Sequence, residues 1–223
     1  MASNRIVARS AVSVAETQLA RVAADGCARH AYLAALIDSA TADFGRDMAD
    51  AVHLLCNLHG RPPALVELAA SMAPAGPARD WLANAANAFE RERLFLVRLT
   101  SAVGPVPSTP GAAETEATLL AQRHAMETLA RSERSGCALG AATALIADWW
   151  PVRRMLDCAA SRAGINCPPP ALPDEASIIR AIETCCDTSS SERALGFGVE
   201  QLLLQHRGLF DLLEARAEAR NRF

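Results

Sequence analysis

The sequence predicts an all-α fold: a single-domain multi-helix bundle of about eight or nine helices over residues 1–223. Three observations lead to this prediction. Apolar residues recur at helical spacing almost throughout, and no segment alternates apolar and polar residues as a half-buried strand would. Clusters of proline and glycine separate the periodic segments. With 51% hydrophobic residues, the chain has enough apolar side chains for a substantial core.

The periodic segments, taken in order, predict helices over residues 4–24, 27–43, 46–59, 63–72, 78–103, 111–134, 136–163, 174–186 and 190–220. The segments 104–111 and 164–173 are rich in proline and read as the two long loops. Asp174 is a natural N-cap after the second loop. Ser189 with Glu192 has the spacing of a capping box that opens the last helix.

The segment 136–163 is the predicted central helix, because it is apolar on both of its faces. Gly136, Gly140 and Ala144 recur every four residues, which favours tight packing against another helix or, alternatively, against a flat ligand. Pro151 is expected to kink or weaken this helix near its middle.

The chain has no lysine, so all 22 basic residues are arginine, and its formal net charge is −3. This composition excludes Schiff-base and P-loop lysines, and the absence of a basic block argues against a nucleic-acid partner. The seven cysteines form no C-x-x-C pair, which indicates a reducing compartment. With no signal peptide and no apolar run long enough to span a membrane, we expect a soluble, cytoplasmic protein without membrane contact.

The helical phase of each polar residue separates those that should face inward from those that should face solvent. By this test Asp50 and His53, which echo the carboxylate-x-x-His pairs of di-iron bundles, should both face solvent. His206 lies at the centre of a leucine-rich stripe and should face inward, as a core histidine or as a functional one. His30 should be half inward.

Three carboxylates are also expected to face inward: Glu92, Glu133 and Asp148. Buried carboxylates need a paired cation or a metal. Arginine is one explanation, and the candidates for it are Arg93, Arg131, Arg134 and Arg153. The alternative is a metal held by Glu92, Glu133, Asp148 and His206, because carboxylates and histidines are also the ligand types of di-iron sites.

The stretch Glu133-Arg-Ser-Gly-Cys-Ala-Leu-Gly-Ala141 resembles the distal-helix segment of bacterial haem oxygenases. This resemblance implies a haem lying against Gly136 and Gly140, with His30 as its axial ligand. The chain as a whole also resembles a set of all-helical proteins from GC-rich alphaproteobacteria, through segments such as HLLCNLHGRPP and VGPVPSTPG.

The sequence therefore favours a bacterial helical-bundle module that self-associates, as a homodimer or other homo-oligomer, or binds a ligand. The alternative is a haem-oxygenase-like or ferritin-like oxidoreductase with haem or iron inside the bundle. A third interpretation is a small-molecule binder whose pocket is floored by Trp149 and the glycine face. Whether the protein is an enzyme, and which cofactor it would use, stay open.

Overall fold

A computed structural model describes residues 13–222 and is all-helical, as the periodicity predicted. Within these residues lie nine α-helices and one short 3-10 helix, η1 (Cys27–Arg29). The α-helices are α1 (Val14–Asp25), α2 (Ala31–Ile37), α3 (Phe44–His59), α4 (Leu65–Met72), α5 (Pro77–Ala102), α6 (Ala112–Ala130), α7 (Cys137–Arg162), α8 (Glu175–Cys185) and α9 (Ser189–Asn221).

The helix ends follow from local chemistry. Asp174 caps α8 as predicted, since its carboxylate accepts the Ser177 N–H at 2.8 Å. The box that opens α9 lies one residue earlier than expected: Thr188 is the N-cap and exchanges hydrogen bonds with Ser191. The prediction for this box was wrong because three consecutive serines offer several similar caps.

Two predicted helices are shorter or broken. The segment 27–43 holds η1 and α2, separated at His30, whose extended backbone and side chain cap α2 by accepting the Tyr32 N–H. The segment 111–134 stops being helical after Ala130. A pattern of apolar residues continues across such short breaks, so it does not reveal them. The predicted helix over 4–24 is observed from Val14, and residues 1–12 lie outside the described part of the chain.

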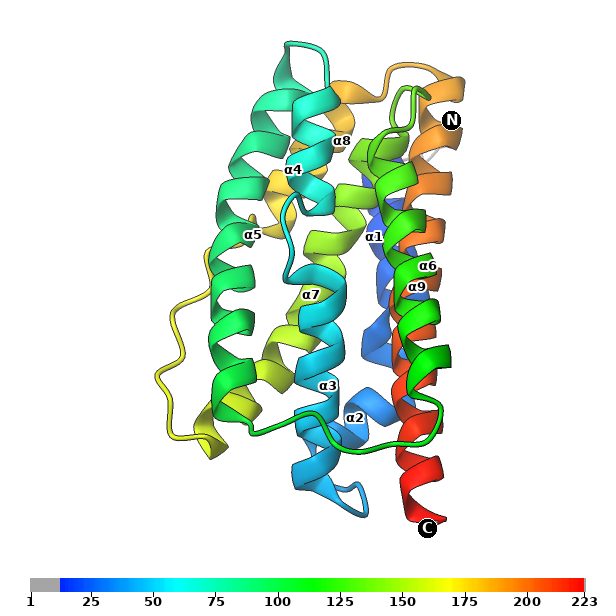
Figure 1. Cartoon of the computed structure of the whole chain (residues 1–223). Helices are drawn as coiled ribbons and strands as arrows, with labels where there is room; N and C mark the ends of the chain where they lie inside the picture. Colours follow the sequence, from blue (N-terminus) through cyan, green and yellow to red (C-terminus); the bar gives the residue numbers. More distant parts are fainter. Residues whose placement is uncertain (1–12, 223) are drawn as a thin grey trace, which may run out of the picture.

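The helices α7 and α9 share the most extensive helix–helix contact of the bundle. Figure 1 shows α9 running along one side of the molecule, with α7 crossing behind α3. As predicted, α7 is buried on opposite faces; it also continues as one helix through Pro151.

Glycines allow the close approach of α7 and α9. A Cβ atom on Gly140 would lie inside 3.0 Å of the Leu195 carbonyl oxygen, and one on Gly198 inside 3.0 Å of the Cys137 carbonyl oxygen. Gly136 similarly faces the backbone at Ser191. The glycine spacing therefore serves helix packing, and Gly136 and Gly140 do not face a flat ligand as the haem interpretation required.

The loop between α5 and α6 crosses one end of the bundle, in front of α3 and towards the C-terminal end of α9 (Figure 1). This path brings residues 103–111 next to helices that are distant from it in sequence. Within residues 13–222, no helix has the length and apolar content needed to cross a membrane.

Candidate functional site

The core contains three separate groups of buried polar side chains. Glu92, which is 1% exposed, belongs to the first of them. Its two oxygens accept hydrogen bonds from the Trp149 indole at 3.1 Å and from Arg153 at 2.6 Å. Burial raises the pKa of Glu92, and the neighbouring Arg153 opposes that rise. The prediction that an arginine neutralises this carboxylate is confirmed, and Arg153 is that arginine.

Asp148 belongs to a second group and has no arginine within ion-pair distance among residues 13–222. One carboxylate oxygen accepts the Cys27 backbone N–H at 2.9 Å, and the other lies 2.8 Å from Nδ1 of His206. The Cys27 thiol donates to the Asp148 backbone carbonyl at 3.2 Å. The arginine explanation is therefore wrong for Asp148, because the hydrogen-bond partners of this carboxylate are a histidine and a backbone amide.

His206 is 2% exposed, which confirms its predicted inward position. Its second ring nitrogen, Nε2, is buried without a hydrogen-bond partner, and so is Nε2 of His59. The two imidazole rings meet edge to face with their centroids 5.2 Å apart. Burial lowers the pKa of His59 well below its usual value, and the nearby His206 and Arg123 lower it further.

The remaining predicted ligands lie elsewhere. Glu133 is exposed in the turn between α6 and α7, so its predicted inward position is wrong; the helix that would have carried it ends at Ala130. His30 uses both ring nitrogens, one accepting the Tyr32 N–H and one bonded to Asp211 at 2.9 Å. The structure thus brings Asp148 and His206 together, without Glu92, Glu133 or His30 joining them.

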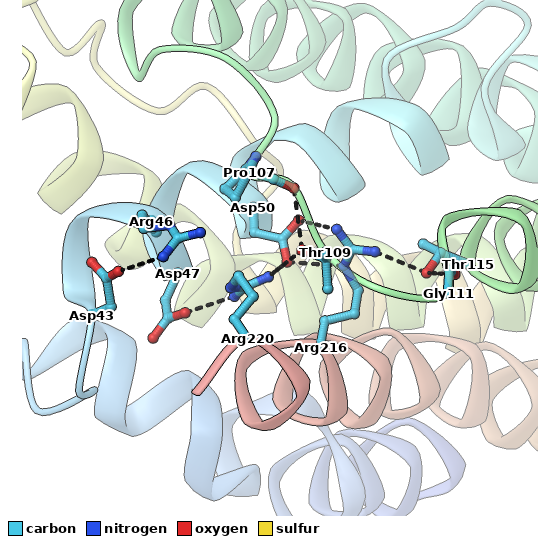
Figure 2. A network of polar contacts seen from close by, with 10 residues as sticks. All are labelled: Asp43, Arg46, Asp47, Asp50, Pro107, Thr109, Gly111, Thr115, Arg216 and Arg220. Carbon is cyan, nitrogen blue, oxygen red and sulfur yellow. Dashed lines mark hydrogen bonds and ion pairs between the residues drawn. The ribbon is translucent and has the colours of Figure 1, made fainter. Parts of the chain in front are cut away.

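The third group is an acid–arginine network at the end of the bundle shown in Figure 2. Asp50, predicted to face solvent, is 0% exposed. It accepts two hydrogen bonds from Arg216, at 2.8 and 2.9 Å, and one from Arg220 at 2.5 Å. Arg220 also binds Asp47 at 2.6 Å. Two carboxylates on α3 thus balance two guanidinium groups on α9.

Two hydroxyl groups tie this network to the α5–α6 loop and to α6. Thr115 accepts a hydrogen bond from Arg216 at 2.9 Å, and Thr109 accepts one from Arg220 at 3.0 Å (Figure 2). The network therefore holds the loop against α9.

The prediction for Asp50 failed because it assumed that α3 has a single apolar face. In fact α3 contacts α2, α5, α6, α7 and α9, so a residue away from its main stripe still meets protein. His53, the other half of the pair, is half-buried and bonds to the Gly104 carbonyl at 2.8 Å.

A cleft of about 440 Å³ lies beside the network, between α3, α6 and the α5–α6 loop. Leu54, Leu119 and Val106 contribute apolar walls, while Ser108, Thr109 and Thr115 contribute hydroxyl groups. Arg216 lies at the base of the cleft, where Asp50 and Thr115 hold its guanidinium group. The pocket predicted over Trp149 is not there: Trp149 is 0% exposed.

Arg61 and Arg123 line this cleft and also a smaller neighbouring pocket of about 150 Å³ that contains His59. Within residues 13–222, neither arginine has a carboxylate at ion-pair distance, although Glu116 lines the larger cleft and Glu127 the smaller pocket. Arg123 donates to the Asn57 carbonyl, and its Nε is buried without a partner. The cleft therefore combines apolar walls with two arginines that have no carboxylate partner in the described part of the chain.

The sequence did not predict this cleft, because a loop that crosses the end of the bundle has no periodic pattern of apolar residues. Comparison with known proteins assigns it no chemistry either: no curated protein and no solved structure matches the chain. A family model does match, over residues 22–221, which spans α2 to α9 and the last turn of α1. The chain accordingly belongs to DUF6975, a family of unknown function.

Proposed function

We propose that this protein is a ligand-binding helical module that takes a small organic anion with an apolar body into the 440 Å³ cleft. The observation that carries the proposal is the pair Arg61 and Arg123, two guanidinium groups without carboxylate partners among the described residues, at a cleft with apolar walls. Its volume lies within the range of small-molecule sites, roughly 300–1,000 Å³.

The cleft separates two kinds of contact. The apolar side chains of Leu54 and Leu119 suit a hydrocarbon or aromatic group, and the guanidinium fork of Arg123 suits a carboxylate or sulfonate. Because Arg216 is already neutralised by Asp50, it supports the base of the cleft and leaves anion binding to Arg61 and Arg123.

The experiment is a titration with decanoate and with 8-anilinonaphthalene-1-sulfonate, two amphipathic anions with different apolar groups. We expect one saturable site, competition between the two probes, and at least tenfold weaker binding in Arg61→Gln/Arg123→Gln. Arg91→Gln is the matched control, since Arg91 is exposed on α5 and does not line the cleft. Equal loss in the control, or unchanged affinity in the double variant, would contradict the proposal.

A cytoplasmic location belongs to the same proposal, supported by seven free cysteines, four of them half-buried and one exposed. Self-association stays a prediction. It is supported by exposed apolar side chains on the long helices, among them Leu94 and Val97 on α5 and Leu204 on α9.

A further inference from the structure

We propose that Cys27, Asp148 and His206 form a buried site for one divalent cation of the zinc type. The site is separate from the anion cleft and does not depend on it. The three side chains come from η1, α7 and α9, and one ligand atom of each lies within 4.8 Å of the other two. All three residues are buried.

The donor set suits zinc. A thiolate, a carboxylate and an imidazole are all zinc ligands, and sites with three protein ligands keep a fourth position for water. Zinc–ligand bonds of about 2.0–2.3 Å separate neighbouring ligand atoms by about 3.3–3.6 Å in tetrahedral geometry. The 2.8 Å separation between the Asp148 oxygen and Nδ1 of His206 therefore widens by about half an ångström when zinc binds, and Sγ of Cys27 lies within 4.8 Å of both atoms.

The backbone around the site fixes the carboxylate. The Cys27 N–H holds one oxygen of Asp148 at 2.9 Å, which leaves the other oxygen directed to His206. Gly26 makes this approach feasible, because a Cβ atom there would lie inside 3.0 Å of the Asp148 carboxylate. Such hydrogen bonds to a ligand's second oxygen are typical of metal sites.

Charge also distinguishes this group from the two other buried ones. Glu92 and Asp50 each face arginine, whereas Asp148 faces only the imidazole of His206 within ion-pair distance in the described chain. A buried carboxylate is costly without a paired charge, and a bound cation supplies one. With the cation on Nδ1, the neutral His206 ring carries its proton on Nε2, and the Asp148 oxygen now hydrogen-bonded to Nδ1 is free to bind the cation.

A cleft at the surface gives a cation access to the buried site. Asp148 borders a cleft of about 430 Å³ between α1, η1 and α7, separate from the anion cleft. Its charged lining residues are Glu16, Glu175 and Asp148, all acidic, which favours entry of a cation. Ala147 and Pro151 line the same cleft, and Pro151 has no N–H to donate to the Ala147 carbonyl. Of the three ligand residues, Asp148 lines this cleft, which gives a cation a route from solvent to the buried site.

The test uses Co²⁺ as a spectroscopic substitute for Zn²⁺ on the full-length, chelator-treated protein. We expect one equivalent to bind with a thiolate-to-cobalt absorption band, and Zn²⁺ to displace it. Cys27→Ser should abolish the band, and Asp148→Asn and His206→Gln should each weaken binding at least tenfold. Cys158→Ser, which alters a half-buried cysteine on the same α7, should bind like the wild type.

A second measurement needs no variant and so does not depend on how the substitutions fold. X-ray absorption of the zinc-loaded wild type should show one sulfur at about 2.3 Å together with nitrogen and oxygen ligands. A shell without sulfur, a thiolate band that persists in Cys27→Ser, or no stoichiometric binding by the wild type would each overturn the proposal.

Discussion

Substitution of Asp50 by alanine tests whether the acid–arginine network holds the end of the bundle together. The carboxylate is 0% exposed and accepts three hydrogen bonds from Arg216 and Arg220. Its removal leaves Arg216 without a carboxylate partner among the described residues, while Arg220 keeps Asp47 alone. Breaking a buried ion pair in this way costs about 3–5 kcal/mol.

The assay is urea unfolding followed by circular dichroism at 222 nm. For a chain of this length, about 2–4 °C of melting temperature corresponds to 1 kcal/mol, so Asp50→Ala should also lower the melting temperature by roughly 6–20 °C. Glu218→Ala is the matched control on α9, because Glu218 pairs with Arg222 at 3.4 Å on the exposed surface. An exposed pair contributes less than about 1 kcal/mol.

The double variant Asp50→Leu/Arg216→Met distinguishes charge from packing. It removes one carboxylate and one guanidinium group together, and the pair Asp47–Arg220 stays balanced. Replacing a whole buried pair by apolar residues of similar size is often close to neutral, so we expect the double variant to recover most of the loss. If Asp50→Ala costs no more than Glu218→Ala, or if the double variant is as unstable as the sum of its parts, the network does not stabilise the fold in this way.

Two further predictions concern the core. Gly140→Ala should destabilise the protein by about 2–4 kcal/mol in urea unfolding, because its methyl group meets the Leu195 backbone, and a result within 0.5 kcal/mol of the wild type would contradict the described packing. Gly45→Ala, in α3 with nothing within 4 Å of a new Cβ, should instead be neutral or stabilise by up to about 1 kcal/mol. His59 stays neutral when folded because burial lowers its pKa, whereas the unfolded chain takes up a proton below about pH 6.5. The free energy of unfolding therefore falls as the pH drops below about 6.5, because only the unfolded chain takes up this proton. In His59→Phe this fall should be smaller by about 1 kcal/mol at pH 5.5. The exposed His124, changed to Gln, should leave the acid dependence as in the wild type.

Helix periodicity was sufficient to predict the fold class, because most helices keep one stripe of apolar residues towards a shared core. It was insufficient at His30 and after Ala130, where the chain leaves the helix for a few residues while the apolar pattern continues. Such breaks depend on caps and on tertiary contacts, and Glu133 was misplaced for this reason.

The acid–arginine network could not be predicted from the sequence for a different reason. Asp47 and Asp50 lie three residues apart, and Arg216 and Arg220 lie four apart, so each pair shares one helix face. This complementary spacing was visible in the sequence. It predicts an ion-pair network only once the fold is known to place α3 against α9, more than 160 residues away in the sequence.

Without lysine, arginine was the expected partner of the inward carboxylates Glu92, Glu133 and Asp148, with a metal as the alternative. In the structure, arginine pairs with the carboxylates of two of the three buried groups. Arg153 forms an ion pair with Glu92, and both Arg216 and Arg220 form ion pairs with Asp50. Each guanidinium group makes several hydrogen bonds at once, which suits a permanent structural partner. Asp148 accepts a hydrogen bond from a backbone amide and lies beside an imidazole and a thiol, and the imidazole and the thiol can each exchange a proton for a metal ion. The one buried carboxylate group without an arginine partner among the described residues is therefore the place in the core where an exchangeable cation fits.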